Sequence, residues 1–416
     1  MKEGSRESAL LLRQFGEAPV AEDVRNGAVM KVPMSSPDLS DAEREAVAAV
    51  LKTRTLSIGP EVEAFEQAIA GLSGRRYGIA VSSGTAALHL CVRAAGIQEG
   101  DLVITSPFSF VASANVLLYE RAVPVFVDVD PATGNLDPEQ VGAASAALTS
   151  GEDGWLPRKN VGNGGKLRAI LTVDVFGQPA DYGRLAPIVE TYGLDLIEDS
   201  SEALGAHYSG QPAGSFGDAG VFAFYPNKQL TTGEGGMVVT DREDWADWIR
   251  ALRNHGRAVG DAWLQHTYPG YNYRLDEMSA ALGRVQAGRI EELLNKRAQV
   301  AEWYGIALAN IESLELPALV PTTSSMSWFV YVVRLDPAID RSEIIKALQQ
   351  DGIPSRAYFE PIHLQPYMVE IHGYRAGDFP IAEDLGNRSL ALPFSGVMTE
   401  EQVGLVSEAL RNVLAS

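Results

Sequence analysis

Short apolar runs alternate with helical patterns between residues 77 and 240, and this alternation limits the possible folds more than any other feature. The apolar runs have the length of buried strands. They cover residues 77–81, 101–105, 123–129, 169–175, 194–197 and 220–224. Strands that alternate with helices predict an α/β fold, with a largely parallel sheet flanked by helices.

Length and composition describe a globular chain of more than one domain. The 416 residues exceed one compact core, so two domains are expected. A net charge of −20 repels phosphate backbones and argues against binding of nucleic acid. The single cysteine, Cys91, excludes a disulfide framework or a Cys-rich metal site within one chain. No apolar run is long enough for a membrane span and no secretory signal pattern is present, so we expect a cytoplasmic location.

The sequence divides into three parts. Residues 1–32 mix charged and small residues and are expected to form an N-terminal extension, which is a candidate for disorder. Residues 33–288 are assigned to a large domain that begins with a helix capped by Ser40 and Glu43. A long helix expected over residues 277–309 bends or breaks near Gly288, and residues 289–416 are assigned to a small C-terminal domain.

Residues 194–236 carry the strongest candidates for chemistry. One apolar run ends at Glu198 and Asp199, and the next leads through Pro226 to Lys228. A lysine held in a cleft can lose its proton and attack a carbonyl carbon. Taken alone, Lys228 is more often a surface lysine, and Asp199 is more often a helix cap. Both stand at strand ends, where open α/β sheets bind ligands, and this favours a site.

Two further segments follow strands at the same edge of the predicted sheet. Ser83, Gly84 and Thr85 open a helix, and their exposed backbone N–H groups at its positive end favour an anion. A plain helix cap is the alternative, and this signal is weak by itself. Phe108 and Phe110 follow another strand and are able to stack on a flat ring, although aromatic residues are more often part of the core.

Taken together, these motifs resemble those of the DegT/DnrJ/EryC1/StrS family, the sugar aminotransferases of the fold-type I pyridoxal-phosphate class. The matching segments are residues 56–60, 83–88, 124–130, 198–199, 225–228, 233–236, 252–256 and 270–275. The resemblance implies a large domain with a mixed, mainly parallel seven-stranded sheet, a smaller C-terminal α/β domain, and pyridoxal 5′-phosphate as the cofactor.

The resemblance also implies roles for single residues. Lys228 matches the lysine that binds the cofactor and moves the proton, and Asp199 matches the carboxylate at the pyridine nitrogen. The other implied cofactor contacts are Ser83, Gly84 and Thr85 at the phosphate, Phe110 at the ring face, Glu202 at the ring hydroxyl, and Asn272 at the phosphate of a neighbouring subunit. Positions near the substrate are implied for Arg274, His363 and Tyr225.

Two positions depart from the usual family pattern. Many members have Gln or His in place of Glu202, and a second carboxylate repels Asp199 unless one of the two is protonated or points away. Many members have a phosphate-binding Ser in place of Ala223, so that donor is missing or supplied elsewhere. The candidate substitutes are Ser82, Ser83, Asn227 and Gln229.

The implied reaction is a transamination between L-glutamate and a keto sugar linked to a nucleoside diphosphate. A 4-keto-6-deoxyhexose is the expected acceptor, and a 3-keto sugar or a cyclic ketone of the inosose type is the alternative. A non-catalytic regulator that binds pyridoxal phosphate is the alternative from another class, and the intact pair of Asp199 and Lys228 disfavours it. The implied assembly is a homodimer with shared active sites, without nucleic acid or membrane partners.

Overall fold

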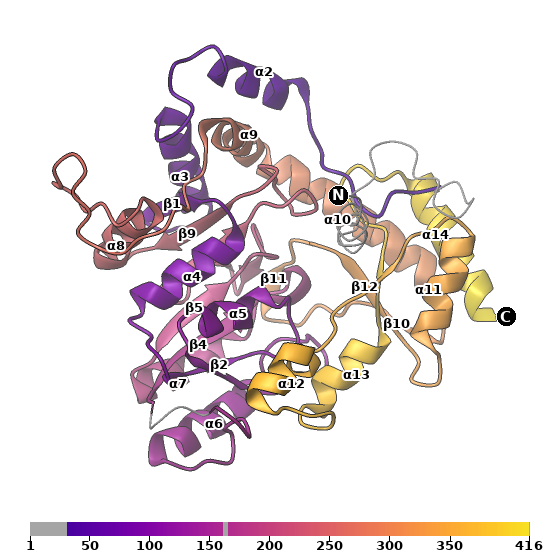
Figure 1. Cartoon of the computed structure of the whole chain (residues 1–416). Coiled ribbons are helices and arrows are strands. Elements are labelled where there is room, and N and C mark those ends of the chain that lie inside the picture. Colours follow the sequence, from indigo (N-terminus) through magenta and orange to yellow (C-terminus); the bar gives the residue numbers. More distant parts are fainter. Residues whose placement is uncertain (1–30, 161–164, 416) are drawn as a thin grey trace, which may run out of the picture.

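The computed structural model describes residues 31–160 and 165–415 (Figure 1). The predicted extension over residues 1–32 lies outside the described residues, apart from its last two. Of these, Val32 is fully buried in the core of the C-terminal part, and the backbone N–H of Lys31 donates to the carbonyl of Gly352 at 3.0 Å. Residues 161–164 also lie outside the described part.

A seven-stranded mixed sheet forms the centre of the large domain, as predicted. Its strands are β1 (Tyr77–Val81), β2 (Leu102–Thr105), β3 (Val123–Phe126), β4 (Leu167–Val173), β5 (Asp195–Asp199), β8 (Ala219–Ala223) and β9 (Gly236–Thr240). The spatial order is β1-β9-β8-β5-β4-β2-β3. Strand β9 is antiparallel to both of its neighbours, while β8, β5, β4, β2 and β3 run parallel.

Both faces of this sheet are covered by helices because successive strand residues point to opposite faces. Ile79 and Val81 of β1 belong to the core on one face, and Ala80 belongs to the core on the other. The first face packs against α4 (Gly84–Ala94), α5 (Ala112–Tyr119) and α8 (Glu243–Arg253). The second face packs against α3 (Pro60–Leu72), α6 (Pro138–Ser150), α7 (Tyr182–Tyr192) and α9 (Glu277–Gly288).

The first described helix, α2 (Asp41–Val50), has the predicted cap. The Glu43 carboxylate accepts from the Ser40 backbone N–H at 2.7 Å, and the Ser40 hydroxyl accepts from the N–H of Ala42. Burial alone would raise the pKa of Glu43, but hydrogen bonds from Ser40, Gln286 and Arg289 lower it to about 2. These contacts hold α2 against the end of α9.

The long helix is broken at Arg289, one residue beyond the predicted position, and continues as α10 (Ile290–Leu308). The C-terminal part that follows has an antiparallel sheet in the order β10-β12-β14-β13. Its elements are β10 (Leu314–Glu315), β12 (Tyr331–Leu335), β13 (Arg356–Ala357), β14 (Ser389–Leu392), α11 (Arg341–Gln350) and α14 (Glu400–Ala415).

The two parts of the chain are joined at several places. A small sheet pairs β6 (His207–Tyr208) with both β7 (Gln211–Pro212) and β11 (Thr323–Ser325). Two C-terminal helices, α12 (Pro366–His372) and α13 (Pro380–Arg388), pack on the core of the large sheet and lie between the two halves in Figure 1. Asp128 after β3 caps α13 by accepting from two of its first N–H groups at 2.9 Å. The boundary at residues 288 and 289 stays a prediction.

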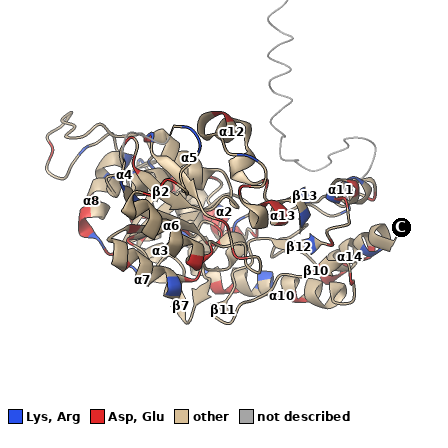
Figure 2. Ribbon diagram, turned by 90° about the horizontal axis from the view of Figure 1, so that it is seen from below, with Lys and Arg blue, Asp and Glu red and all other residues tan. Residues whose placement is uncertain are grey.

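Charged residues are spread along the ribbon, with acidic and basic positions interspersed (Figure 2). Among residues 31–160 and 165–415, no helix has the length and apolar character needed to cross a membrane.

Candidate active site

A cavity of about 350 Å³ lies at the carboxyl ends of the strands in the large sheet. This volume falls in the usual range for small-molecule sites, about 300 to 1,000 Å³. The segments that follow β1, β2, β5 and β8 contribute to its wall, as expected for a parallel sheet. The predicted site residues that line it are Ser83, Gly84, Thr85, Phe110, Asp199, Glu202, Tyr225 and Lys228.

Lys228 stands in the turn after β8, with its side chain largely buried. Its Nζ lies 3.6 Å from Oε1 of Glu202 and 3.8 Å from the centre of the Phe329 ring. Burial lowers the pKa of the amine, and the nearby carboxylates of Glu202 and Asp199 oppose this effect only in part. A lowered pKa increases the fraction of neutral amine, which is the nucleophilic form.

Two buried carboxylates follow β5 and face the same cavity. Asp199 is 6% exposed and accepts from the N–H of Ser201 at 3.2 Å. Glu202 directs one oxygen to the Lys228 amine, and the other accepts from the N–H of Phe176 at 2.9 Å. Burial raises the pKa of both carboxyl groups, and the proximity of Asp199 raises that of Glu202 further. The repulsion expected between Asp199 and Glu202 therefore exists, and the amine of Lys228 counters it.

A further carboxylate, Asp174, fixes the turn that follows Asp199. Its oxygens accept from the hydroxyls of Ser200 and Tyr182, both at 2.6 Å, and from the N–H of Ala180 at 2.8 Å. Burial raises the pKa of Asp174 to about 6, although these hydrogen bonds favour the charged form. The end of β5 is thereby held at the base of the cavity.

The start of α4, which begins at Gly84, forms another side of the cavity. The Ser83 hydroxyl caps this helix by accepting from the N–H of Ala86 at 3.1 Å. A Cβ added to Gly84 would lie 2.7 Å from Cβ of Ala223, so residue 223 faces the start of α4. The free N–H groups of the first turn suit a phosphate, and the methyl group of Ala223 adds no donor.

The four candidate substitutes for the missing donor differ in availability. The Ser83 hydroxyl only accepts in the helix cap, so its O–H group is still free to donate. The Gln229 amide donates to Ser327 and to the carbonyl of Glu202. Ser82 is not part of the cavity wall. Asn227 lines the cavity, and its buried Oδ1 has no hydrogen-bond partner among the described residues. Of the four, Ser83 therefore has a donor left for a phosphate, whereas the unpartnered Oδ1 of Asn227 is an acceptor.

Aromatic side chains cover the remaining walls. Phe110 is 63% exposed and Tyr225 is 49% exposed, and both stand at the edge of the cavity. Phe329, Tyr358 and Phe359 enter from the C-terminal part. Such flat apolar faces suit a planar ring.

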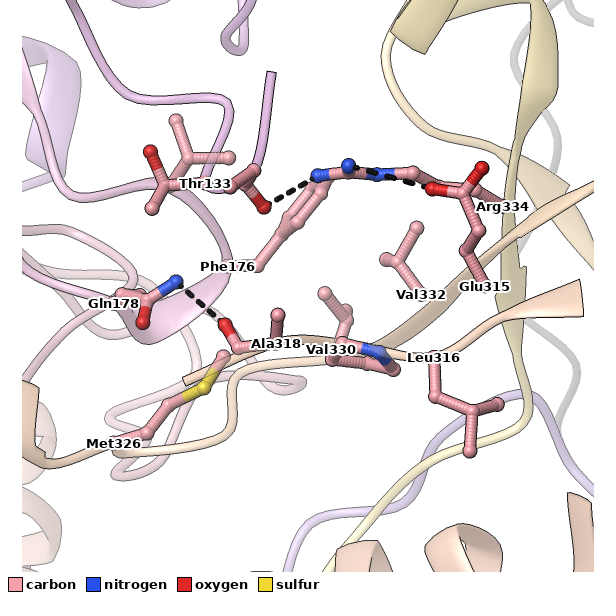
Figure 3. Close-up of a pocket in the computed structure, with 13 residues that line it drawn as sticks. Thr133, Phe176, Gln178, Glu315, Leu316, Ala318, Met326, Val330, Val332 and Arg334 are labelled. Carbon is pink, nitrogen blue, oxygen red and sulfur yellow. Dashed lines mark hydrogen bonds and ion pairs between the residues drawn. The ribbon is translucent and has the colours of Figure 1, made fainter. Parts of the chain in front are cut away.

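A second, small cavity of about 30 Å³ is lined by Phe176 and lies where the two parts of the chain meet (Figure 3). Here the Gln178 side chain donates to the carbonyl of Ala318 at 3.2 Å, and Arg334 donates to the carbonyl of Ala132 at 2.8 Å. Because the N–H of Phe176 also binds Glu202, the contact between the two parts sets the position of Glu202.

Three predicted residues lie outside the main cavity. Asn272 is exposed, and its backbone bridges to Asn254. Arg274 donates to Oδ1 of Asn254 at 3.0 Å and lines a separate cavity of about 220 Å³. His363 is fully buried, with Nε2 3.0 Å from Oε1 of Glu383. His363 does not line the main cavity, and its expected contact with the substrate stays a prediction.

Sequence reasoning missed the contributions of the C-terminal part. Phe329 and Tyr358 stand in no motif that marks a site, so both had the pattern of ordinary core residues. Arg297 is also absent from the predicted site, although its guanidinium donates to the backbone of Lys228 at 2.6 Å. The one signal for Arg297 is its place on the buried face of α10.

Comparisons with known proteins agree on one family. The model of the DegT/DnrJ/EryC1/StrS aminotransferase family matches residues 37–411. The spore coat polysaccharide biosynthesis protein SpsC of Bacillus subtilis is 34% identical over 397 residues, which cover 92% of this chain and 97% of that protein. GDP-perosamine synthase of Caulobacter vibrioides is 35% identical over 389 residues, 92% of this chain and 98% of that protein.

Solved structures give the same result. The pyridoxal-phosphate form of the putative sugar aminotransferase Spr1654 from Streptococcus pneumoniae superimposes with a TM-score of 0.84. It is 26% identical, and the alignment covers 92% of this chain and 98% of that chain. The cavity described here fits this cofactor on its own geometry. It combines a helix start for a phosphate, a buried carboxylate at Asp199 and a buried amine at Lys228.

Proposed function

Because the chain belongs to the DegT/DnrJ/EryC1/StrS aminotransferase family and is thus a pyridoxal-phosphate-dependent aminotransferase, we propose that it aminates a keto sugar carried on a nucleoside diphosphate. L-Glutamate is the proposed amino donor. The observation that carries this proposal is the meeting of Lys228, Asp199 and Glu202 in one cavity beside the start of α4. This set provides an amine, two acids and an anion site within reach of one ligand.

Each of these groups has a proposed task. Pyridoxal phosphate, when bound, supplies a carbonyl carbon that takes up amino groups and a ring that withdraws electrons. The first turn of α4 would hold its phosphate, and Asp199 would keep the ring nitrogen protonated. Lys228 would hold the cofactor and, once free, carry a proton to and from the substrate carbon.

Glu202 has a task that the resemblance does not specify fully. Its carboxylate lies 3.6 Å from the Lys228 amine, and burial raises its pKa. A carboxyl group in this position is suited to exchange a proton with that amine. The N–H of Phe176 keeps the group oriented while it does so.

A nucleoside-diphosphate 4-keto-6-deoxyhexose is the acceptor we propose. The relative named GDP-perosamine synthase supports a nucleotide-linked sugar, because its name gives a GDP-linked amino sugar as the product of that protein. A 3-keto sugar or a cyclic ketone of the inosose type is the alternative within the same reaction. The exposed aromatic side chain of Tyr225 at the cavity edge is suited to the sugar end of such a substrate, while Phe110 is proposed to stack on the cofactor ring.

The two halves of the reaction are tested separately. Adding L-glutamate to the purified holoenzyme should change its visible absorbance and yield 2-oxoglutarate. The glutamate-loaded enzyme is then mixed with 4-keto and 3-keto sugars linked to GDP, UDP and dTDP, and with an inosose, and products are identified by mass spectrometry. Amination of a 4-keto nucleotide sugar supports the proposal. Amination of the inosose alone contradicts the acceptor, and unchanged absorbance contradicts the donor.

We also propose a homodimer in which each subunit completes the site of the other. Asn272 and Arg274 lie outside the cavity of their own chain, while exposed apolar side chains such as Ile58 stand beside Arg274. Mixing inactive Lys228→Ala with inactive Asn272→Ala subunits should restore activity, because half of the mixed dimers' sites carry neither change. Random exchange predicts recovery of about a quarter of the wild-type activity. Zero recovery after verified exchange contradicts shared sites.

A further inference from the structure

Arg297 is a buried arginine whose guanidinium forms no ion pair within the described part of the chain. It lies on α10, which runs from the end of α9 into the C-terminal part in Figure 1, and it is 4% exposed. Within residues 31–160 and 165–415, no carboxylate comes within ion-pair distance of its guanidinium. Burying a guanidinium in this way is costly unless its donors are satisfied. The hydrogen bonds it makes are therefore informative.

All four of its hydrogen bonds go to backbone carbonyls on two separate segments. Nη2 donates to the carbonyls of Asn227 at 3.0 Å and Lys228 at 2.6 Å. Nη1 donates to the carbonyls of Trp328 at 3.1 Å and Phe329 at 3.2 Å. The planar guanidinium of an arginine is able to hold two backbone segments at once in this way, and the ammonium group of a lysine is not.

The two segments are those that enclose the Lys228 amine. One carries the lysine itself, and the other carries Phe329, whose ring centre lies 3.8 Å from Nζ. We propose that Arg297 is the positioning residue for Lys228, because its guanidinium holds both of the segments that enclose the amine. The inference rests on the proposed role of Lys228 in binding the cofactor.

The charges around the amine give Arg297 a second effect. Burial lowers the pKa of Lys228, Glu202 and Asp199 raise it, and the cationic Arg297 lowers it. Tyr358 lines the same cavity, and burial raises the pKa of its phenol to about 12. Loss of the guanidinium therefore leaves the two carboxylates less opposed, and the ammonium form of Lys228 becomes more favoured.

The test measures the reactivity of Lys228 itself. Apoenzyme is pulse-labelled with acetic anhydride over a range of pH, and the peptide with Lys228 is quantified by mass spectrometry. In Arg297→Met, the apparent pKa of Lys228 should rise. The capture of pyridoxal phosphate, measured after borohydride reduction, should slow by about ten-fold or more. In Arg297→Lys, the charge remains and the planar guanidinium is lost, so capture should slow with a smaller change in pKa.

A matched control comes from the same region. Arg289 is bound by Asp38, Glu43 and Glu292 and touches no part of the cavity. Arg289→Met should lower the melting temperature while leaving the pKa and the capture rate of Lys228 unchanged. The Arg297 proposal is overturned if Arg297→Lys and Arg297→Met, each shown to be folded by circular dichroism, keep the wild-type pKa and capture rate.

Failure of the proposed function gives a different result. If wild-type protein captures pyridoxal phosphate at a residue other than Lys228, the role of Lys228 is wrong whatever the Arg297 variants do. If Arg297→Met does not fold, Arg297→Lys decides the matter by its capture rate.

Discussion

Restoring a hydroxyl at residue 223 should tighten the binding of the cofactor through its phosphate. Many family members have Ser at this position, and this chain has Ala223 at the end of β8. The Cβ of Ala223 lies 2.7 Å from the point where a side chain would begin on Gly84, the first residue of α4. A hydroxyl in Ala223→Ser therefore stands beside the helix start that we expect to hold the phosphate.

The magnitude follows from the charge of the acceptor. A hydrogen bond to a charged group contributes about 1.5–3 kcal/mol. Ala223 is only half-buried, so water competes for the phosphate and the lower value applies. A gain of about 1.4 kcal/mol corresponds to ten-fold tighter binding. No existing hydrogen bond is lost, because the alanine methyl makes none.

The assay compares pyridoxal phosphate with pyridoxal, which lacks the phosphate. Apoenzyme is titrated with each ligand. The dissociation constant of pyridoxal divided by that of pyridoxal phosphate isolates the contribution of the phosphate. Ala223→Ser should increase this ratio about ten-fold, while Ala338→Ser on an exposed turn should not change it. An unchanged ratio in Ala223→Ser, or equal tightening for both ligands, refutes this reading of the phosphate site.

Three further changes test other parts of the account. Asp199→Asn should keep the fold but slow the glutamate half-reaction by about two orders of magnitude, measured by stopped-flow absorbance; an unchanged rate means another group supports the ring nitrogen. Glu277→Ala removes the acceptor for three N–H groups at the start of α3, at 2.9 to 3.1 Å. The free energy of unfolding, measured in urea, should fall by about 3 kcal/mol. A loss below about 1 kcal/mol contradicts this role of Glu277. The raised pKa of Asp174, from 3.8 to about 6, means that the folded state binds the proton more tightly, so this group's contribution to stability falls as pH rises across that window. Asp174→Asn should remove that part of the pH dependence. If the free energies of unfolding of wild type and variant, measured in urea, change in parallel with pH, this contribution of Asp174 is excluded.

The sequence pattern predicted the large domain well because burial there is local and periodic. The alternation at Ile79, Ala80 and Val81 follows from the pleat of a strand, and a short window of sequence contains it. The same reasoning placed Asp199 and Lys228 at one edge of the sheet. Both line the cavity, because parallel strands present their carboxyl ends together.

Local sequence patterns carry no information about burial where distant segments return to the sheet. His363 follows a proline-rich loop and has the pattern of an exposed residue, yet it is buried where residues 362–385 pack on the large domain. Nothing near it in the sequence reports that contact. Phe329 and Arg297 reach Lys228 for the same reason, through packing of the C-terminal part that no local periodicity encodes.

Chemical trapping of the cofactor tests the central claim most directly, namely that the amine of Lys228 binds pyridoxal phosphate opposite the carboxylate of Asp199. The holoenzyme is reduced with borohydride and digested, and the modified peptide is sequenced by mass spectrometry. We predict a single modified residue, Lys228, and loss of both modification and transamination in a folded Lys228→Ala variant. Modification of a different lysine, or continued turnover by Lys228→Ala, contradicts the account.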